Sequence, residues 1–385
     1  MLNFTFHNPT RIVFGQGTMA ALDQHVPLDA RVLVLYGGQS AERNGTLGEV
    51  RTALGQRTCF EFGGIEPNPT FETLMEAVML VRAERIDFLL AVGGGSVIDG
   101  SKFVAAAAQF EGDPWQILSS VGSAVQRALP LGVVLTLSAT GSEMNAAAVV
   151  TRRATQTKAF FHSPWVFPQF SILDPTKTYT LPARQLANGV VDAFTHVMEQ
   201  YLTYPVDARV QDRFAEGLLQ TLIEIGPKVV HEPADYDSRA NLMWAAAMAL
   251  NGLIASGVPQ DWATHLVGHE LTALHGLDHA QTLAVLLPSM LDLRREAKRG
   301  KLLQYAERVW HLTEGSEEDR IEQAILKTRA FFERLGIGTR LSDYGIGEQD
   351  IDALVAALQA HGMVGLGEQG DVTLALSRQV YLASL

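Results

Sequence analysis

The sequence predicts two domains: an α/β domain with a parallel sheet over residues 1–178 and an all-helical domain over residues 179–385. The first observation is length, because 385 residues exceed what one ordinary hydrophobic core organises. The second is the order of the first half, where short apolar runs alternate with helical patterns, as is typical of a parallel sheet covered by helices. The third is the second half, where helical patterns follow one another and no strand is expected.

The elements of the first domain follow in a regular order. RVLVLYGG at 31–38 is a strand that runs into a Gly-Gly turn, and FETLMEAVMLVRAERI at 71–86 has helical periodicity. DFLLAVGGGS at 87–96 is a second strand, and the pattern of 96–108 is helical. LGVVLTLSATGSE at 131–143 is a third buried strand that ends in small polar residues. Because ligands bind at the carboxyl ends of parallel strands, these glycine-rich ends mark the expected binding edge.

The second domain consists of helical patterns separated by proline and glycine. The change comes near LDPTKTYTLPARQ at 173–185, and we place the boundary near residue 178. The predicted helices cover 184–202, 207–229, 237–256, 261–274, 280–297, 299–312, 317–335, 348–360 and 371–384.

Composition excludes several classes of protein. A net charge of −12 argues against nucleic acid or an anionic membrane as the main partner. The single cysteine, Cys59, allows no intrachain disulfide, and we expect it to be a small apolar residue in a strand. No run approaches the ~18 apolar residues that a membrane span requires. The N-terminal MLNFTFHNPTRIVFG lacks a basic region followed by an apolar core, so we expect a cytoplasmic protein.

One glycine turn has the composition of a phosphate site. Gly93-Gly94-Gly95-Ser96 lies between a strand and a helix, where glycines let a phosphate approach the free N–H groups at the helix start. Asp99, in the first turn, could cap the helix or contact a ribose. The alternative is a tight turn without a ligand. The spacing departs from G-x-G-x-x-G, so this is not the usual dinucleotide fingerprint.

A second group of polar residues ends the third strand. Thr136 and the cluster Thr140-Gly141-Ser142 supply hydroxyl groups there. Alone they form a turn, but beside the glycine turn they extend one polar crevice. Lys158 follows in the polar stretch TRRATQTKAF, where composition alone indicates a solvated lysine.

The turn after the first strand bears on which dinucleotide is bound. A carboxylate often stands at this place, where it holds the 2′-hydroxyl of NAD and repels the 2′-phosphate of NADP. Here YGGQS supplies Gly37, Gly38 and Ser40 instead, with Arg43 nearby. Electrostatics therefore favours NADP over NAD, although Glu42 beside Arg43 weakens the preference.

An apolar helix carries a carboxylate and an imidazole on one face. Asp192 and His196 lie four residues apart in GVVDAFTHVMEQ, so their side chains are neighbours on the helix. They could form a buried Asp–His hydrogen bond, which is common. They could also supply half of a metal site, in which case other ligands must come from elsewhere in the chain.

Candidates for those ligands lie in the segment 259–288. It contains His265, His269, His275 and His279 on an apolar background, four of the chain's 11 histidines. Two helices joined by a short turn could direct His265 and His279 to one point. Three imidazole nitrogens and one carboxylate oxygen suit zinc or ferrous iron. Spacing does not decide which histidines bind, and the remaining ones could contact the substrate or pack in the core.

Together these motifs resemble the iron-containing alcohol dehydrogenase family. The similarity rests on GGGSVID, TGSE, DAFTH and the histidine segment, and covers nearly the whole chain. The turn with Gly37, Gly38 and Ser40, FGGIEPNP at 62–69 and HGLDHAQTLA at 275–284 resemble its NADPH-dependent aldehyde reductase and butanol dehydrogenase branch.

The resemblance implies a dinucleotide-binding α/β domain and an all-helical metal-binding domain, the architecture shared with dehydroquinate synthase. It implies NADP(H) as cofactor, one divalent cation (Fe²⁺ or Zn²⁺) and a homodimer. The implied metal ligands are Asp192, His196, His265 and His279. The implied cofactor contacts are Gly37, Gly38, Ser40, Gly94, Gly95, Ser96, Asp99, Thr136, Thr140, Ser142 and Lys158.

The expected activity is hydride transfer between NADPH and aliphatic aldehydes, with the carbonyl oxygen polarised by the cation. His269 is a candidate for the proton relay to the alkoxide, and packing in the core is the competing role. A polyol dehydrogenase or a carbocyclic synthase of the same architecture is an alternative, but Trp262 and Leu266 beside His265 favour plain aldehydes and alcohols. A catalytically silent NADP-binding protein is the alternative of another class.

Overall fold

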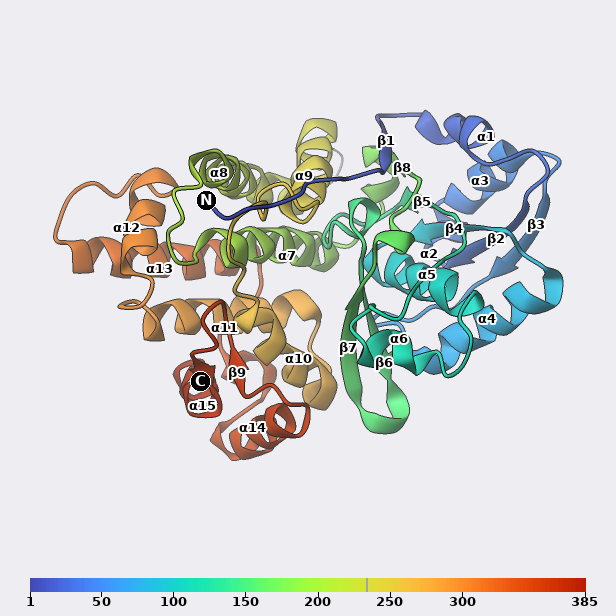
Figure 1. Cartoon of the computed structure of the whole chain (residues 1–385). Coiled ribbons are helices and arrows are strands. Elements are labelled where there is room, and N and C mark those ends of the chain that lie inside the picture. Colours follow the sequence, from blue (N-terminus) through green and yellow to red (C-terminus); the bar gives the residue numbers. More distant parts are fainter. Residues whose placement is uncertain (233–234) are drawn as a thin grey trace. The chain divides into compact units, whose positions relative to one another are not determined.

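The computed structural model describes residues 1–232 and 235–385 and contains two compact units (Figure 1). One unit is His7–Leu181. The other is Pro182–Leu385 together with Met1–Phe6. The N-terminal segment joins the second unit through a 3.0 Å hydrogen bond from the Leu2 N–H to the Gly257 carbonyl oxygen. The predicted domain boundary near residue 178 falls in the 3₁₀ helix η5 (Pro175–Thr178). That residue 178 divides two domains stays a prediction.

The unit His7–Leu181 is built on a six-stranded parallel sheet, so the predicted α/β class is confirmed. The strand order is β1-β8-β5-β4-β2-β3. Its strands are β1 (Arg11–Phe14), β2 (Arg31–Tyr36), β3 (Thr58–Phe62), β4 (Phe88–Gly93), β5 (Leu131–Leu135) and β8 (Phe170–Leu173). The central strands β4 and β5 are buried along their whole length, which explains their continuous apolar runs.

Helices cover the sheet, and a separate antiparallel pair of strands lies between β5 and β8 in the chain. The helices are α1 (Leu22–His25), α2 (Ser40–Arg43), α3 (Thr46–Leu54), α4 (Phe71–Glu84), α5 (Gly95–Ala108) and α6 (Trp115–Ser119), with 3₁₀ helices η1 (Thr18–Ala21), η2 (Ser142–Met144), η3 (Arg153–Thr155) and η4 (Pro164–Val166). β6 (Ala147–Arg152) pairs with β7 (Thr157–His162). Cys59 lies in β3 as expected, but its side chain is exposed.

The packing of β5 against β8 depends on a glycine. An ideal Cβ at Gly132 would come within 2.4 Å of the Phe170 ring, so the ring occupies the space that any side chain at 132 would need. The same ring stacks on Phe88 at a centroid distance of 6.3 Å. A missing side chain in β5 therefore lets an aromatic ring of the neighbouring strand fill the core.

The second unit is helical, as predicted. Its helices are α7 (Ala183–Tyr201), α8 (Arg209–His231), α9 (Tyr236–Ala249), α10 (Ala263–His275), α11 (His279–Leu293), α12 (Arg299–Arg308), α13 (Glu317–Arg334), α14 (Ile351–Ala360) and α15 (Leu374–Ala383), with η6 (Leu341–Tyr344) and η7 (Glu348–Asp350). The sequence missed one antiparallel pair, β9 (Gly365–Leu366) with β10 (Val372–Thr373), because two-residue strands leave no periodic pattern. α7 is buried almost all round, as expected of a core helix. Within the described residues, every helix is too short or too polar to span a bilayer.

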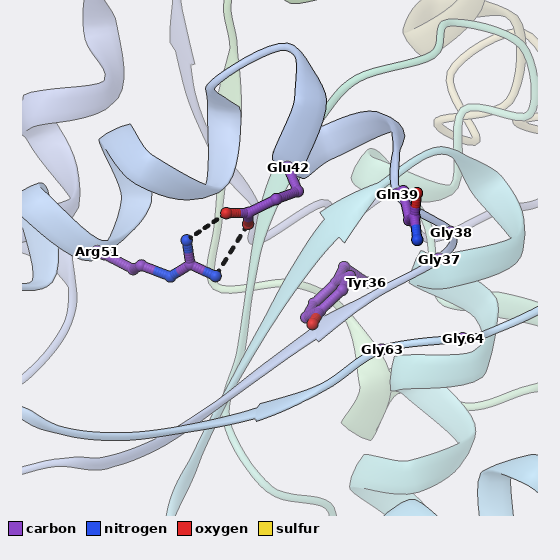
Figure 2. A pocket seen from close by; sticks show the side chains of 8 residues that line it. All are labelled: Tyr36, Gly37, Gly38, Gln39, Glu42, Arg51, Gly63 and Gly64. Carbon is purple, nitrogen blue, oxygen red and sulfur yellow. Dashed lines mark hydrogen bonds and ion pairs between the residues drawn. The ribbon is translucent and has the colours of Figure 1, made fainter.

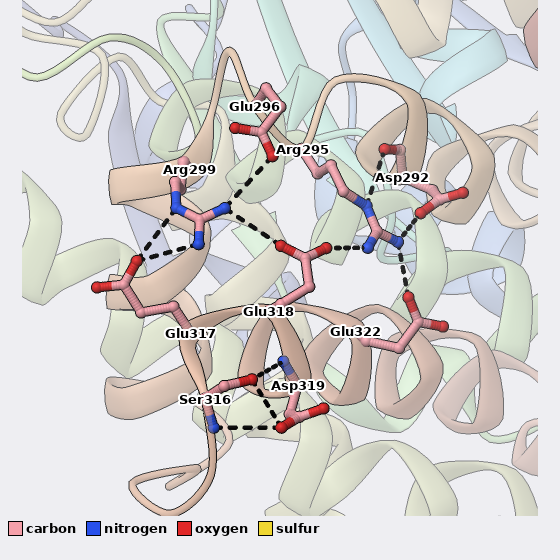
Figure 3. A network of polar contacts seen from close by, with 9 residues as sticks. All are labelled: Asp292, Arg295, Glu296, Arg299, Ser316, Glu317, Glu318, Asp319 and Glu322. Carbon is pink, nitrogen blue, oxygen red and sulfur yellow. Dashed lines mark hydrogen bonds and ion pairs between the residues drawn. The ribbon is translucent and has the colours of Figure 1, made fainter.

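An exposed ionic network joins the α11–α12 region to α13 (Figure 3). Arg295 and Arg299 both contact Glu318, and Arg299 also pairs with Glu317 at 3.1 Å. Ser316 and Asp319 form a capping box that begins α13. Since exposed ion pairs contribute at most about 1 kcal/mol each, each contact of this network adds only modestly to the stability of the fold.

Gly132→Ala is expected to destabilise the protein by about 1–3 kcal/mol, because the added methyl must displace the Phe170 ring. Gly217→Ala, in α8, is the control. A Cβ there meets nothing within 4 Å, and alanine favours a helix by roughly 0.5–1 kcal/mol over glycine, so this variant should be more stable. Urea unfolding measures both. A wild-type midpoint for Gly132→Ala would contradict the packing argument.

Candidate functional site

Three histidines surround one carboxylate oxygen in the helical unit. The Oδ1 atom of Asp192 lies 3.7 Å from His196 Nε2, 4.0 Å from His265 Nε2 and 3.6 Å from His279 Nε2. Asp192 and His196 come from α7, His265 from α10 and His279 from α11. Asp192 is 3% exposed, whereas the His279 side chain is 26% exposed. The group is therefore buried on the α7 side and accessible at His279.

The donor set fits a divalent cation. Asp192, His265 and His279 each offer a ligand atom, and these atoms lie within 4.8 Å of one another. Asp192 Oδ1 is buried and accepts no hydrogen bond from the described residues, which is costly for a carboxylate unless a positive partner is provided. His196 lies outside that compact group of ligand atoms, although its Nε2 also faces Asp192.

Aromatic packing fixes the imidazoles. The His196 and His265 rings stack at 4.8 Å between centroids, and the His265 and His279 rings are 5.1 Å apart. The Trp262 indole meets both His196 and His265 edge-on, at 6.0 and 5.2 Å. Trp262 has a left-handed backbone (φ 62°), rare for a bulky residue, immediately before α10. This conformation brings an apolar ring against two candidate ligands.

The turn between α10 and α11 brings His265 and His279 together. α10 ends at Gly276, which has a left-handed φ of 72°. Asp278 then begins α11 with a capping box, and its carboxylate also accepts hydrogen bonds from Arg184 and Asn188 of α7, both at 2.8 Å. His279 is thus the first residue of a helix tied to α7.

The two helices also pack closely beside these histidines. A Cβ at Gly268 would come within 2.6 Å of the Thr282 hydroxyl oxygen, so glycine allows this close approach. The predicted helix–turn–helix arrangement of the histidine segment is therefore present.

The remaining histidines of the segment lie at the margin. The His269 ring is 5.9 Å from the His279 ring and half-buried, and it does not belong to the compact group of ligand atoms. His275, the last residue of α10, is also half-buried and outside that group.

Sequence reasoning missed Glu199, one turn beyond His196 on α7. Its carboxylate accepts hydrogen bonds from the Thr264 N–H at 2.6 Å and the His265 N–H at 3.3 Å, and it also contacts His265 Nδ1. Burial, and then the nearby Asp261 carboxylate, raises the pKa of Glu199 to about 8, while the N–H donors oppose this shift. The sequence alone did not distinguish Glu199 from other glutamates in helices, because Thr264 and His265 lie in a distant segment of the chain.

In the other unit, the glycine turn is required by packing. A Cβ at Gly95 would lie 2.5 Å from Thr140, and one at Gly94 would lie 2.9 Å from Leu137. The segment after β5 therefore packs against the start of α5, which brings the two polar turns of the sequence prediction together. Gly94 is the N-cap of α5, and no side chain caps its first turn.

Asp99 and Ser142 bind to each other. Asp99 Oδ1 accepts the Ser142 hydroxyl at 2.6 Å, and Asp99 Oδ2 accepts the Val149 N–H at 2.9 Å. Asp99 therefore does not cap α5, which the sequence had left open. Lys102 donates to Ser142 Oγ, Asn145 Oδ1 and the Ala147 carbonyl oxygen at 2.8–2.9 Å.

The pKa values in this cluster follow from burial. Burial lowers the pKa of Lys102 to about 8, and the charges of Asp99 and Glu143 oppose this shift. Burial raises the pKa of Glu143 to about 7, and a backbone hydrogen bond and the Lys102 charge oppose that shift.

Asn68 links two of the predicted cofactor residues. Lys158, in β7, donates to Asn68 Oδ1 at 3.0 Å, and the Asn68 N–H donates to Ser96 Oγ at 3.3 Å. Lys158 therefore contacts a specific partner, which the composition of its segment did not indicate. Asn68 has a left-handed φ of 56° and belongs to FGGIEPNP, a stretch that carried no chemical assignment.

A pocket of about 400 Å³ lies at the end of β2 (Figure 2). Its lining is Tyr36, Gly37, Gly38, Gln39, Glu42, Arg51, Gly63 and Gly64. Arg51 pairs with Glu42 at 2.9 Å and with Glu61 at 2.7 Å. The sequence pointed to Arg43 as the nearby cation, but the arginine that lines this pocket is Arg51.

The similarity to known proteins extends over nearly the whole chain. Residues 9–175 match the family model described as iron-containing alcohol dehydrogenase, and residues 186–367 match the Fe-containing alcohol dehydrogenase family, C-terminal. The chain is 60% identical to NADPH-dependent aldehyde reductase YqhD of Escherichia coli K12, over 100% of both proteins. It is 40% identical to probable NADH-dependent butanol dehydrogenase 1 of Bacillus subtilis, over 95% of both.

A solved structure agrees with these relatives. The crystal structure of E. coli K-12 YqhD has a TM-score of 0.99 and 59% identity, and the match covers 100% of this chain and 99% of that one. The predicted family resemblance and fold class are therefore confirmed.

Proposed function

The chain belongs to the iron-containing alcohol dehydrogenase family, and on this premise we propose that it is a metal-dependent, NADP(H)-linked alcohol dehydrogenase that acts as an aldehyde reductase. The observation that carries the proposal is the convergence of three Nε2 atoms on Asp192 Oδ1. The 60% identical relative, whose name includes NADPH and aldehyde reductase, supports the cofactor and the substrate class.

Asp192, His196, His265 and His279 would hold the cation. When bound, a divalent cation supplies Lewis-acid polarisation of the carbonyl oxygen and stabilises the charge that develops on it. Three nitrogens and one oxygen suit Fe²⁺ and Zn²⁺ alike, and we propose Fe²⁺ because of the family to which both halves of the chain match. The chain itself contributes the convergent geometry and an apolar wall at Trp262.

NADPH would supply the hydride, and the α/β unit would bind and orient it. The proposed contacts remain Gly37, Gly38, Ser40, Gly94, Gly95, Ser96, Asp99, Thr136, Thr140, Ser142 and Lys158. The structure suggests separate roles for four of them. Gly94 and Gly95, at the start of α5, offer backbone N–H groups to the diphosphate, whereas Asp99 and Ser142 hold the neighbouring turn through their mutual hydrogen bond.

The competing polyol dehydrogenase and the silent NADP-binding protein make different predictions. Trp262 beside the histidines favours an apolar substrate over a polyol. An NADPH oxidation assay with butanal, run with and without a chelator, tests the proposal. Oxidation that the chelator abolishes is expected. A preference for glycerol with NAD would support the polyol enzyme, and no oxidation of NADPH by the metal-loaded protein would support the silent protein.

We also propose a cytoplasmic homodimer, the assembly usual in the family. The absence of any possible intrachain disulfide fits a reducing compartment. Light scattering of the purified protein checks the assembly, and a monomeric mass would refute it.

Metal binding is expected to depend on His265. His265→Ala should lose the cation and the activity while it keeps its fold, because a ligand is removed without loss of the surrounding core. Metal content after Zn²⁺ loading measures this, with His275→Ala, on the same helix, as the control that retains the metal. Affinity should also fall at acid pH, since ligating imidazoles must be neutral. Full occupancy in His265→Ala would remove this residue from the ligand set.

His269 is proposed as the proton relay to the alkoxide. His269→Ala should keep the metal but turn over more slowly, on the order of 10²-fold if the residue acts as a general acid. Steady-state rates across pH, together with metal content, measure this. If turnover is unchanged at every pH, His269 is a packing residue and solvent delivers the proton.

Gly38→Asp is expected to shift the cofactor preference from NADPH toward NADH. A Cβ at Gly38 meets nothing within 4 Å, so the aspartate side chain begins in open space, and its charge would repel a 2′-phosphate bound in the pocket. A shift of ~1.4 kcal/mol changes the preference tenfold. The measurement is the ratio of kcat/KM with the two cofactors, with Gly38→Ala as the uncharged control.

The relatives make this test informative, since their names include both NADPH and NADH. The pocket itself contains charges of both signs, Arg51 and Glu42. A wild-type preference for NADH, or a ratio that Gly38→Asp leaves unmoved, would show that the adenosine ribose binds elsewhere.

A further inference from the structure

Glu199 connects α7 to the beginning of α10 at the point where His265 stands. Its side chain is 4% exposed. Oε1 accepts the Thr264 N–H at 2.6 Å, and Oε2 accepts the His265 N–H at 3.3 Å. Oε2 also contacts Nδ1 of the His265 ring. One buried carboxylate therefore meets the free N–H groups of a helix start and the imidazole of a candidate metal ligand.

The two nitrogens of His265 face different carboxylates. Nδ1 faces Glu199, and Nε2 lies 4.0 Å from Asp192 Oδ1. A neutral imidazole carries one proton, and a hydrogen bond from Nδ1–H to a carboxylate leaves Nε2 with its lone pair. Nε2 then points to the oxygen around which the other candidate ligands gather.

We propose that Glu199 is a positioning residue that holds His265 as the Nδ1–H tautomer, with Nε2 directed at the cation, and thereby raises the affinity of the site for a divalent metal. The inference rests on the proposed metal site. Its physical basis is that a hydrogen bond to the outer nitrogen of a ligating histidine fixes the tautomer and the ring orientation.

The neighbouring ionic network keeps Glu199 in place. The Asp261 N–H donates to the Glu199 carbonyl oxygen at 3.0 Å, and Asp261 Oδ1 accepts the Ala263 N–H at 3.0 Å. Asp261 pairs with Arg294 at 2.5 Å and with Lys298 at 2.6 Å. Because both ends of the Glu199–α10 contact are anchored, the carboxylate is oriented before any cation binds.

The test is the Zn²⁺ affinity of the full-length protein, measured by competition with a chromophoric chelator. In Glu199→Gln the amide oxygen can still accept the Thr264 N–H, but the amide NH₂ facing Nδ1 favours the Nε2–H tautomer, which leaves Nε2 without a lone pair for the metal. A loss of about 10–100-fold in affinity is expected. Affinity within twofold of wild type in a folded Glu199→Gln would overturn the proposal.

The chain offers a matched control. Glu270, on α10, is also 4% exposed and binds an imidazole, His361 Nδ1, at 2.8 Å, but it is not part of the group around Asp192. Glu270→Gln should therefore keep the wild-type Zn²⁺ affinity. An equal loss in both variants would show that removing any buried carboxylate weakens the site, and would overturn the specific role of Glu199.

Two further measurements separate the possible failures. If Glu199→Gln does not fold, ¹⁵N NMR of histidine-labelled wild type, with His265 assigned through His265→Ala, reports the tautomer directly. Nδ1–H is expected, and Nε2–H would overturn the inference. If wild type itself binds no Zn²⁺, the proposed metal site fails along with the inference. If wild type binds Zn²⁺ and Glu199→Gln binds it equally, only the inference fails.

Discussion

A buried carboxylate is costly unless a positive charge lies beside it. In the helical unit this carboxylate is Asp192, and the surrounding structure is arranged around it. It belongs to α7, the helix that is buried almost all round, and its Oδ1 accepts no hydrogen bond from the described residues. Three features of the backbone and helix ends position two of the three surrounding imidazoles, those of His265 and His279. Gly268 allows α10 and α11 to approach, Gly276 ends α10, and Asp278 ties the start of α11 to α7.

The α/β unit depends on close approach at the ends of its strands. Gly95 admits Thr140, and Gly132 admits the Phe170 ring, so two of its glycines are explained by packing before any ligand is considered. The buried ammonium of Lys102 then satisfies three acceptors around Ser142. A turn fixed in this way presents its backbone to a ligand without having to reorganise, which is the general advantage of a preorganised site.

The periodicity of the sequence predicted secondary structure and the neighbours of a side chain on its own helix. The four-residue spacing placed Asp192 beside His196, and apolar runs revealed β2, β4 and β5. β3 was anticipated only through Cys59, and β1, β6, β7 and β8 were not predicted. The exposed residues of β6 and β7 interrupt the apolar pattern, and β1 and β8 have only four residues each. Spacing left open which histidines gather, and it gave no sign of Glu199, Asn68 or Arg51. Their partners lie far along the chain, so only the packed structure brings these side chains to a site.

The charges around Asp192 explain why a divalent cation suits this interior. Glu199 lies next to Asp261, and Asp261 shares Arg294 and Lys298 with Glu368. Arg294 also pairs with Asp371, so both cationic side chains contact carboxyl groups other than Asp192. Burial raises the pKa values of Glu199 and Glu368, so these two carboxyl groups keep their protons more readily than free ones. Asp261 differs, because the charges of Lys298 and Arg294 outweigh its burial and lower its pKa. Among the described residues, the groups within ion-pair distance of Asp192 are imidazoles, which are neutral when they bind a metal. A dication bound there would therefore supply to Asp192 the positive charge that Arg294 and Lys298 supply to Asp261.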